Sequence, residues 1–237
     1  MRAFEHTVRQ RGQMDPALWA RWGAALESNR WALVLQKTRE GERILDFGCG
    51  QGAYVEALIR HRREALGVDI HCYEEWRERA AGLGRAEADL FSVTGTPLPF
   101  MDGYFSGVLA FEVLEHCADP LATLGELRRV SQRDLLLSVP DCETNDNLHQ
   151  YSLARAHWTD LTHRNFFTRG SLDTTLRGSG WAPVWYGEAY RIDLNACFWE
   201  YVRLPRLLRR LARSMFRRSG LVRDPYSAIL VHAEKVP

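Results

Sequence analysis

A glycine-rich loop between an apolar strand and a helix constrains the fold of this 237-residue chain more than any other feature. Residues 43–47 (RILDF) predict a short strand, residues 48–52 (GCGQG) a turn, and residues 54–62 a helix. Glycine lets the backbone turn sharply and approach a ligand closely, because no Cβ stands in the way. A strand, a glycine loop and a helix in this order are typical of a nucleotide-binding site at the start of the helix.

The segments that follow alternate between strand-like and helical patterns as far as Pro140. Strands are expected at 65–69, in a segment that ends at Asp89, at 104–110 and at 135–139, and helices at 71–81 and 119–130. Alternation at this spacing favours an α/β fold, in which helices cover both faces of a parallel sheet. Beyond Pro140 we expect a helix at 170–180 and strands at 181–190 and 226–234.

Two regions outside this alternation define the expected domain organisation. Residues 1–40 predict an N-terminal helical cap of one or two helices, because Asp15-Pro16 is a typical helix start. Residues 41–237 predict a single domain. Within it, 141–169 is expected to be a substrate loop and 191–224 a basic lid insert.

The composition excludes several classes of protein. Apolar residues make up 46% of the chain and charged residues 26%, which is typical of a globular domain and not of a disordered chain or a coiled-coil rod. A net charge of +1 does not require a nucleic-acid partner. Five cysteines without a CxxC pair indicate reduced thiols instead of a disulfide framework or a zinc ribbon. No secretory signal is recognisable, so a cytoplasmic protein is expected.

The spacing of the glycines and of two acidic residues indicates which nucleotide binds. The GxGxG pattern departs from the GxGxxG of dinucleotide sites, which counts against NAD and FAD. Asp69 lies 23 residues after Asp46 and ends the second expected strand, where a carboxylate can accept hydrogen bonds from both ribose hydroxyls. Asp89 ends the third expected strand, where it can accept from an adenine amino group.

Five stretches occur in a fixed order within residues 42–140: ILDFGCGQG, GVDI, EADL, LPFMDGYFSGVLAFEVLEHCADP and LLLSVP. In this order they resemble the class I S-adenosylmethionine-dependent methyltransferases, in the subgroup that methylates small molecules. The resemblance implies a Rossmann-like, seven-stranded, mostly parallel sheet whose last two strands form an antiparallel hairpin. The chain departs from the family pattern at Ser106, where many relatives carry aspartate, and we expect this position only to support the strand.

The resemblance also implies positions for S-adenosylmethionine and its product S-adenosylhomocysteine. The implied cofactor-binding residues are Asp46, Gly48, Cys49, Gly50, Gly52, Asp69, Ile70, Asp89, Leu90, Phe111 and Glu112. The glycine loop, supported by Asp46, and residues 111–112 would line the methionine portion. Asp69 would bind the ribose, and Asp89 with the backbone of Leu90 would bind the adenine.

The expected substrate loop carries the candidates for catalysis. Methyl transfer is an in-line displacement in which the cofactor brings its own leaving group, so the protein mainly supplies proximity and orientation. A hydroxyl acceptor also has to lose its proton, and a histidine with a pKa of ~6.5 suits that step. His163 is the first candidate for this base, with Asp160 to fix its tautomer, and His116 is the second.

Two other interpretations of His163 stay open at this point. Its side chain can simply hold the loop to the sheet by a hydrogen bond, or it can ligate a metal ion. The nearby residues with metal-binding atoms are Cys142, His149, His157 and Asp160. No two of these residues show a standard zinc spacing, so the sequence predicts no metal site.

Residues 203–218 form a basic, amphipathic segment with seven arginines and no acidic residue. Its apolar residues at helical spacing are Leu204, Leu207, Leu208, Leu211 and Met215. The segment is interpreted as a lid whose apolar stripe packs on the sheet, as a helix that contacts an anionic membrane or a lipid-linked substrate, or as a phosphate site. Nucleic acid is not expected, because aromatic and basic residues are not interleaved.

Together these features predict a methyltransferase that uses S-adenosylmethionine and acts on a small-molecule, sugar or lipid-linked acceptor, at oxygen. The acceptor pocket is expected where the substrate loop, the basic insert and the N-terminal helices meet, if the strand at 181–190 runs parallel to the central strands. The alternatives are N-methylation of a small amine, a cofactor-binding scaffold without catalysis, and an NAD oxidoreductase. The last alternative fits the glycine loop but not the motif at 98–120.

Overall fold

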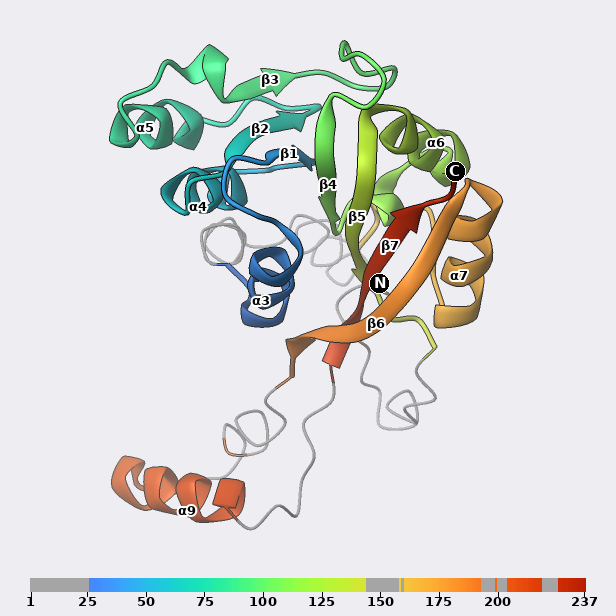
Figure 1. Ribbon diagram of the computed structural model, residues 1–237. Helices are drawn as coiled ribbons and strands as arrows, with labels where there is room; N and C mark the ends of the chain where they lie inside the picture. Colours follow the sequence, from blue (N-terminus) through green and yellow to red (C-terminus); the bar gives the residue numbers. More distant parts are fainter. Residues whose placement is uncertain (1–25, 144–157, 159, 193–198, 200–203, 219–225) are drawn as a thin grey trace, which may run out of the picture.

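The computed structural model describes residues 26–143, 158, 160–192, 199, 204–218 and 226–237. Its centre is a seven-stranded sheet with the order β3-β2-β1-β4-β5-β7-β6 (Figure 1). The strands are β1 (Arg43–Phe47), β2 (Glu64–Asp69), β3 (Phe91–Val93), β4 (Phe105–Phe111), β5 (Ser131–Pro140), β6 (Trp181–Arg191) and β7 (Tyr226–Lys235). The helices are α3 (Ser28–Lys37), α4 (Ala53–Arg60), α5 (Glu75–Gly82), α6 (Pro120–Val130), α7 (Arg169–Gly178) and α9 (Arg206–Arg218), with short 3₁₀ turns η1 (Glu87–Asp89) and η2 (Leu114–His116).

The direction of the strands confirms the predicted α/β architecture. Strands β1 to β5 run parallel, whereas β7 runs antiparallel to both of its neighbours, β5 and β6. Strand β6 is therefore parallel to the central strands, which was the condition for the expected acceptor pocket. The carboxyl ends of β1, β2, β4, β5 and β6 consequently share one edge of the sheet, and this is the edge at which α/β proteins bind ligands.

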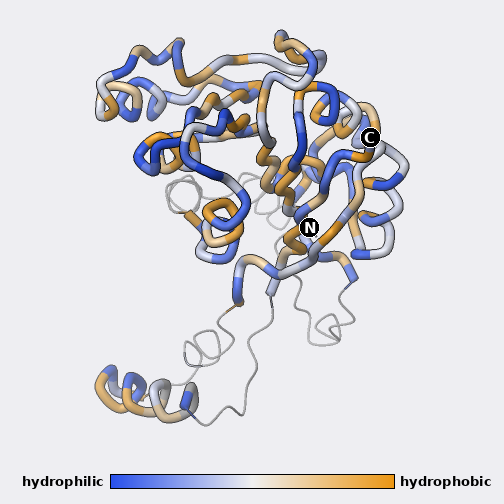
Figure 2. The backbone as a smooth tube through the Cα atoms, viewed as in Figure 1, coloured by the Kyte–Doolittle hydropathy of each residue, from blue (hydrophilic) through white to orange (hydrophobic). Residues whose placement is uncertain are grey.

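Alternate residues of the central strands supply two layers of core, one on each face of the sheet. On one face, Leu135, Leu137 and Val139 of β5 pack with apolar residues of α6 and α7. On the opposite face, Leu136 packs with residues of α3, α4 and α5. Burial on both faces explains why this strand is apolar at successive positions instead of alternating with polar residues (Figure 2).

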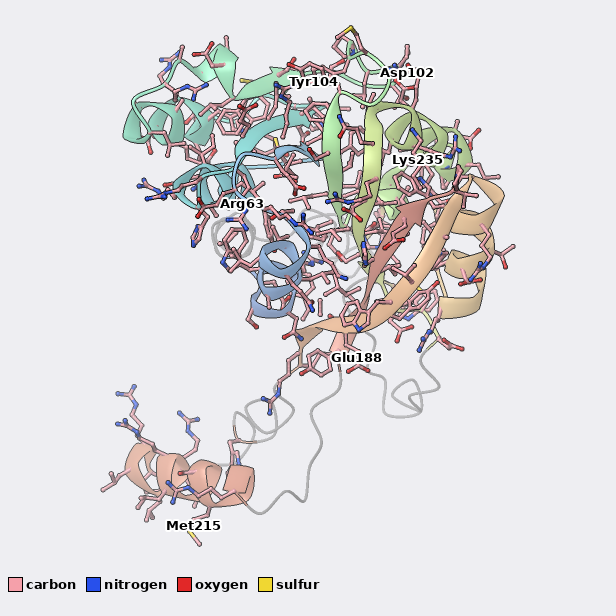
Figure 3. The ribbon with its side chains drawn as sticks, in the orientation of Figure 1. Arg63, Asp102, Tyr104, Glu188, Met215 and Lys235 are labelled. Atoms are coloured by element: carbon pink, nitrogen blue, oxygen red, sulfur yellow. The ribbon has the colours of Figure 1, made fainter. Side chains whose placement is uncertain are left out.

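The two edges of the sheet differ in what they carry. Asp102 and Tyr104 precede β4 and mark the edge formed by the amino ends of the strands, whereas Glu188 marks the carboxyl end of β6 (Figure 3). At that carboxyl edge α3 is tied to β6, because the Asn29 side chain donates to the Glu188 carbonyl over 2.8 Å. The described part of the N-terminal cap is thus attached where the ligand is expected.

Helix α9 extends away from the sheet (Figure 1). Its stripe of apolar residues is exposed, with exposed fractions of 70% for Leu207, 55% for Leu211 and 73% for Met215. The stripe therefore does not pack on the sheet. The interpretation of this segment as a lid required that packing, so it does not agree with the structure. No helix in the described part of the chain has the length and apolar character needed to cross a membrane.

One strand lies elsewhere than the sequence indicated, which moves Asp89. The third strand was expected to end at Asp89, but this residue lies in η1 and β3 follows it. The register is set by two hydrogen bonds to β2: Gly67 N–H donates to Leu90 O, and Thr94 N–H donates to Asp69 O. Asp89 consequently lies near the amino end of β3, away from the edge that carries the glycine loop.

The remaining boundaries differ only at their ends. Helix α5 begins at Glu75 instead of residue 71, because the His71 N–H donates to the Asp69 carboxylate over 3.0 Å and the chain turns before the helix. Helix α7 ends at Gly178. The predicted helix start at Asp15-Pro16, His149 and His157 lie outside the described residues.

Candidate functional site

The glycine loop joins β1 to α4 in a conformation that favours glycine. Gly48, Gly50 and Gly52 have φ angles of +73°, +49° and +80°, in the left-handed region. The N–H groups of Gly48 and Cys49 both donate to Val68 O, over 2.8 and 3.1 Å, which holds the loop against the end of β2. Gly52 then precedes the first turn of α4, so the N-terminus of this helix faces the loop.

Two of these glycines face different surroundings. A Cβ at Gly48 would lie 2.4 Å from Cγ2 of Val113, so this position is closed by the segment after β4. A Cβ at Gly50 would meet no atom within 4 Å, so this position borders open space. Gly48 is therefore required by packing, whereas Gly50 leaves room for a bound group.

This difference predicts the behaviour of two alanine variants. Both should lose about 1–2 kcal/mol of folding free energy to the left-handed backbone. Gly48→Ala should lose a further ~1–3 kcal/mol, because its methyl group overlaps Val113. Urea unfolding of the two variants beside the wild type measures the difference, and equal losses would contradict the packing assigned to Gly48.

Two carboxylates flank the loop. Asp69, at the end of β2, accepts the N–H of Gly50 on one oxygen and the N–H of His71 on the other, each over 3.0 Å. Asp46 is buried behind the loop, and its Oδ2 has no hydrogen-bond partner among the described residues. Burial, with the charge of Asp69 as the second cause, raises the pKa of Asp46 to about 7. Asp69 thus contacts the backbone of the glycine loop directly.

Helix α5 supports the loop from outside the motif. Trp76 Nε1–H donates to Gly50 O, and Arg79 Nε–H donates to Gln51 O, both over 2.7 Å. The Trp76 ring also stacks on Phe91 with a centroid distance of 5.0 Å, which ties the helix to β3. The spacing of Trp76 and Arg79, three residues apart on one helical face, was the sequence signal for this pair, and it was missed.

Glu112 is held by a buried arginine from α3. Arg30 Nη2 lies 2.5 Å from Glu112 Oε1, and the same oxygen accepts from Ser138 Oγ over 3.0 Å. Arg30 Nη1 donates to the Tyr190 hydroxyl over 2.6 Å, and the guanidinium carbon lies 4.1 Å from the centre of the Tyr190 ring. One side chain therefore connects α3, the end of β4 and the end of β6. Sequence patterns did not single out Arg30.

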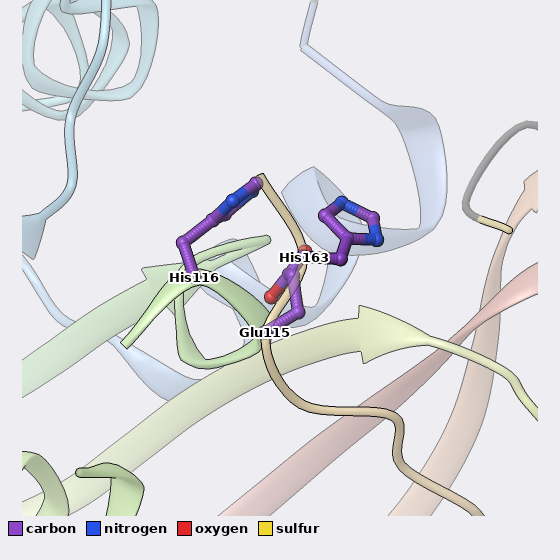
Figure 4. Close-up of side chains that lie close together, drawn as sticks. All are labelled: Glu115, His116 and His163. Carbon is purple, nitrogen blue, oxygen red and sulfur yellow. The ribbon is translucent and has the colours of Figure 1, made fainter. Parts of the chain in front are cut away.

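Two histidines lie together beyond β4, although 46 residues separate them in sequence. The ring centroids of His116 and His163 are 4.7 Å apart, and Glu115 lies beside them (Figure 4). His163 Nε2 is 3.5 Å from Asp160 Oδ2. His116 Nδ1 is 3.0 Å from Thr162 Oγ1, which donates to Asp160 Oδ1 over 2.6 Å. Asp160 thus contacts one ring directly and the other through Thr162.

Backbone hydrogen bonds fix the two halves of this cluster to each other. Glu115 O accepts the N–H groups of Arg164 and Asn165, over 2.7 and 3.0 Å. The Asn165 side chain donates to Leu114 O and Cys117 O, over 3.1 and 2.7 Å. The turn η2 is therefore tied to residues 160–165, and the relative position of the histidines does not depend on their side chains alone.

Most of the predicted site residues come together at the carboxyl edge of the sheet. Those around the glycine loop and the end of β4 are Asp46, Gly48, Cys49, Gly50, Gly52, Asp69, Ile70, Phe111 and Glu112. His116, Asp160 and His163 form a separate cluster past the end of β4. Asp89 and Leu90 do not join either group, because they precede β3 and Leu90 O is already paired with β2.

Comparison with known proteins identifies the family to which this chain belongs. The chain matches the family described as methyltransferase domain over residues 19–185. It is 33% identical over 125 residues to an uncharacterized methyltransferase of Mycobacterium sp. (strain JLS), across 51% of this chain and 48% of that protein. It is 30% identical over 156 residues to a ubiquinone biosynthesis O-methyltransferase of Cereibacter sphaeroides (strain KD131 / KCTC 12085), across 61% of this chain and 62% of that protein. The matched regions cover less than two thirds of either relative.

A solved structure has the same fold. The 1,6-didemethyltoxoflavin-N1-methyltransferase of Burkholderia thailandensis, solved with 1,6-didemethyltoxoflavin and S-adenosylhomocysteine, superposes with a TM-score of 0.59. The match covers 89% of this chain and 78% of that chain at 16% sequence identity. At this identity the likeness shows the shared architecture and nothing about the substrate.

Proposed function

Because this chain belongs to the methyltransferase-domain family and has the class I S-adenosylmethionine-dependent methyltransferase fold, we propose that it transfers a methyl group from S-adenosylmethionine to an oxygen atom of a small-molecule, sugar or lipid-linked acceptor. The observation that carries the proposal is the joint position of the glycine loop, Asp69 and the histidine cluster at one edge of the sheet. The bound cofactor supplies an activated methyl group with its own leaving group. The residues of the chain hold the two reactants in line and promote loss of the acceptor proton.

The glycine loop fits the cofactor in shape and charge. Gly50 leaves open space directly beside Asp69, and the Asp69 carboxylate keeps lone pairs after accepting two backbone N–H groups. Vicinal ribose hydroxyls are donors that match these lone pairs. The methionine portion then lies along the loop toward Glu112, whose carboxylate is held in place by Arg30.

The adenine takes a different position from the one that the sequence suggested. With Asp89 at the amino end of β3, the groups beside Asp69 are Ile70 and Val93, and Val93 pairs in register with Asp69. Both apolar side chains are exposed, 69% for Ile70 and 53% for Val93. We place the apolar faces of the adenine against these two side chains, since covering them removes apolar surface from water.

The histidine cluster favours oxygen as the methylated atom. A hydroxyl has to lose its proton as the new bond forms, whereas an unprotonated amine can attack the methyl group with less help from a base. His163 lies beside Asp160 at the carboxyl edge of the sheet and can promote that loss. His116 is the second candidate. One of the two similar proteins is named as an O-methyltransferase and the other as an N-methyltransferase, so their names do not decide between the two atoms. The choice of oxygen rests on the side chains of the site.

The test is transfer of label from methyl-labelled S-adenosylmethionine to an extract of the source cells, followed by partition into organic and aqueous phases. Label in the organic phase identifies a hydrophobic or lipid-linked acceptor, and label in aqueous metabolites identifies a sugar or another polar molecule. Binding of S-adenosylhomocysteine without transfer in either phase would contradict the proposal and favour a cofactor-binding scaffold.

Helix α9 supports a lipid surface as the place where the enzyme meets its acceptor. Leu207, Leu211 and Met215 recur every four residues and form one exposed apolar stripe. The helix also carries arginine at six positions and no acidic residue. A basic helix with an exposed apolar stripe matches the interface of an anionic membrane, in which the stripe reaches the acyl chains and the arginines meet the headgroups.

The positive charge of α9 predicts how the protein binds to lipid vesicles. Changing Arg206, Arg209 and Arg210 together to glutamine should weaken binding to vesicles that contain phosphatidylglycerol by ~100-fold, because each basic residue near the surface contributes ~1 kcal/mol. Co-sedimentation with anionic and neutral vesicles measures the effect. Failure of the wild type to bind the anionic vesicles would remove the lipid surface from the proposal.

A control removes two positive charges elsewhere on the surface. Arg62 and Arg77 are highly exposed and make only long ion pairs with Glu40 and Glu87, of 3.7 and 3.8 Å. Their joint replacement by glutamine should leave vesicle binding within ~3-fold of the wild type, since surface charges far from the bilayer are screened by salt. A loss as large as that of the α9 variant would show a net-charge effect instead of docking through α9.

A further inference from the structure

The side chain of Glu115 is buried, and one of its carboxylate oxygens lacks a hydrogen-bond partner within the described part of the chain. The residue is 1% exposed, and Oε2 has no hydrogen-bond partner among the described residues. A buried carboxylate costs several kcal/mol unless it is protonated or paired with a cation.

The neighbours of Glu115 are two partly buried imidazoles. One ligand atom of Glu115, one of His116 and one of His163 all lie within 4.8 Å of one another (Figure 4). Each imidazole has two nitrogens: Nδ1 of His116 lies beside Thr162, and Nε2 of His163 lies beside Asp160. Two imidazoles and one carboxylate are a donor set suited to a divalent transition-metal ion.

The surroundings of the cluster resemble the support that metal ligands need. Asp160 accepts the N–H and the hydroxyl of Thr162, over 2.9 and 2.6 Å, and lies 3.5 Å from His163. A carboxylate behind a histidine fixes the orientation of the ring and raises its basicity toward a metal. The hydrogen bonds of Glu115 O to Arg164 and Asn165 keep the two segments together, so little rearrangement is needed to bind an ion.

From these contacts we propose that Glu115, His116 and His163 bind one divalent transition-metal ion of the zinc or iron class, and that Asp160 positions His163. Sequence spacing predicted no metal site, because the donors belong to two segments that only the fold brings together. With three protein ligands, the ion keeps open positions for oxygen atoms of an acceptor. The acceptor class that fits is a hydroxyl compound with a second oxygen close by, such as a vicinal diol or a catechol.

This inference rests on the proposed function and specifies how the cluster serves it. The acceptor O–H, bound to the ion, loses its proton to solvent because the positive charge lowers its pKa. The acceptor oxygen then forms a bond to the methyl carbon as the carbon–sulfur bond breaks. The products are the methyl ether, S-adenosylhomocysteine and one proton, so that neither oxidant nor reductant is needed. His163 acts in this scheme as a ligand instead of accepting the proton itself.

The test is metal binding by the full chain after removal of metals with a chelator. We expect one Zn²⁺ per chain by calorimetry, and one Co²⁺ with visible absorption typical of nitrogen ligands. Asp160→Asn should weaken Zn²⁺ binding by about 10–100-fold and shift the Co²⁺ spectrum, which loss of a purely structural contact would not do. Glu115→Gln and His163→Asn remove ligands and should weaken binding by more than this.

A control variant and the possible outcomes distinguish failure of the metal site from failure of the proposed methyl transfer. His61→Asn changes an exposed histidine at the C-terminal end of α4, which lies 2.8 Å from Ala57 O and packs edge-on against Trp31 at a centroid distance of 5.0 Å, and it should leave affinity unchanged. Absence of Zn²⁺ and Co²⁺ binding in the wild type, or equal binding in Glu115→Gln and His163→Asn, would overturn the metal site. Full methyl transfer by the chelated enzyme would likewise overturn it while leaving the proposed function standing.

Discussion

Replacing Asp69 with alanine is expected to weaken binding of S-adenosylhomocysteine by about 30–140-fold, which corresponds to ~2–3 kcal/mol for hydrogen bonds to a charged acceptor. The Asp69 carboxylate stands at the end of β2, beside the open space at Gly50. Neutral acceptors bind hydroxyl groups more weakly than a carboxylate does, so Asp69→Asn should fall between the alanine variant and the wild type. Calorimetric titration measures all three affinities.

Asp69 also supports the loop, and this second role has to be separated from binding of the ribose. Its oxygens accept the N–H groups of Gly50 and His71, so the alanine variant can lose affinity merely because the loop moves. The 2′-deoxy analogue of S-adenosylhomocysteine distinguishes the two roles. If Asp69 binds the ribose, the wild type prefers the parent compound by about tenfold and the Asp69→Ala variant loses most of that preference.

The matched control is an acidic residue at the opposite edge of the sheet. Asp102 is exposed, pairs with Arg129 over 2.7 Å and lies near the amino ends of the strands (Figure 3). Asp102→Ala removes the same charge and should leave cofactor affinity within ~2-fold, because a screened charge at that distance contributes little. An unchanged preference for the parent compound in Asp69→Ala would refute the ribose assignment even if affinity falls.

The parts of the site that sequence predicted correctly are those set by local structure. The turn at 48–52 follows from its glycines, and Asp69 follows from the end of an apolar strand that can be recognised by itself. Each of these features depends on residues close together in the chain, where side-chain pattern and backbone preference agree.

The parts of the site that the sequence did not predict depend on contacts between distant segments. Asp89 was assigned to the end of a strand, but the hydrogen bond between Gly67 and Leu90 shifts the strand past it, and no pattern within EADL encodes this pairing. Arg30 reaches Glu112 across 82 residues, and its helix lies before the recognised motifs. Glu115 was overlooked because a single buried carboxylate is indistinguishable from a solvated one in sequence.

His163→Asn is expected to lower the rate of methyl transfer by about 10²–10⁴-fold while leaving the affinity for S-adenosylhomocysteine within ~3-fold. The reason is position: His163 lies against His116 and Asp160 beyond the end of β4, whereas the glycine loop and Asp69 make the cofactor contacts. The rate is measured under single-turnover conditions with the acceptor found by partition, because product release then does not mask the chemical step. A loss below tenfold would favour a nitrogen acceptor.

Combining substitutions shows whether the cluster acts as one unit. If His163 and Asp160 promote loss of the same proton, whether directly or through a bound ion, the double variant should be about as slow as His163→Asn alone. If the two side chains contribute separately, the logarithms of their effects should add. His116→Asn completes the set, since Thr162 links its ring to the same Asp160 carboxylate. Additive effects in all pairs would leave the cluster as a scaffold for the loop, and the proton of the acceptor would then have to leave by another route.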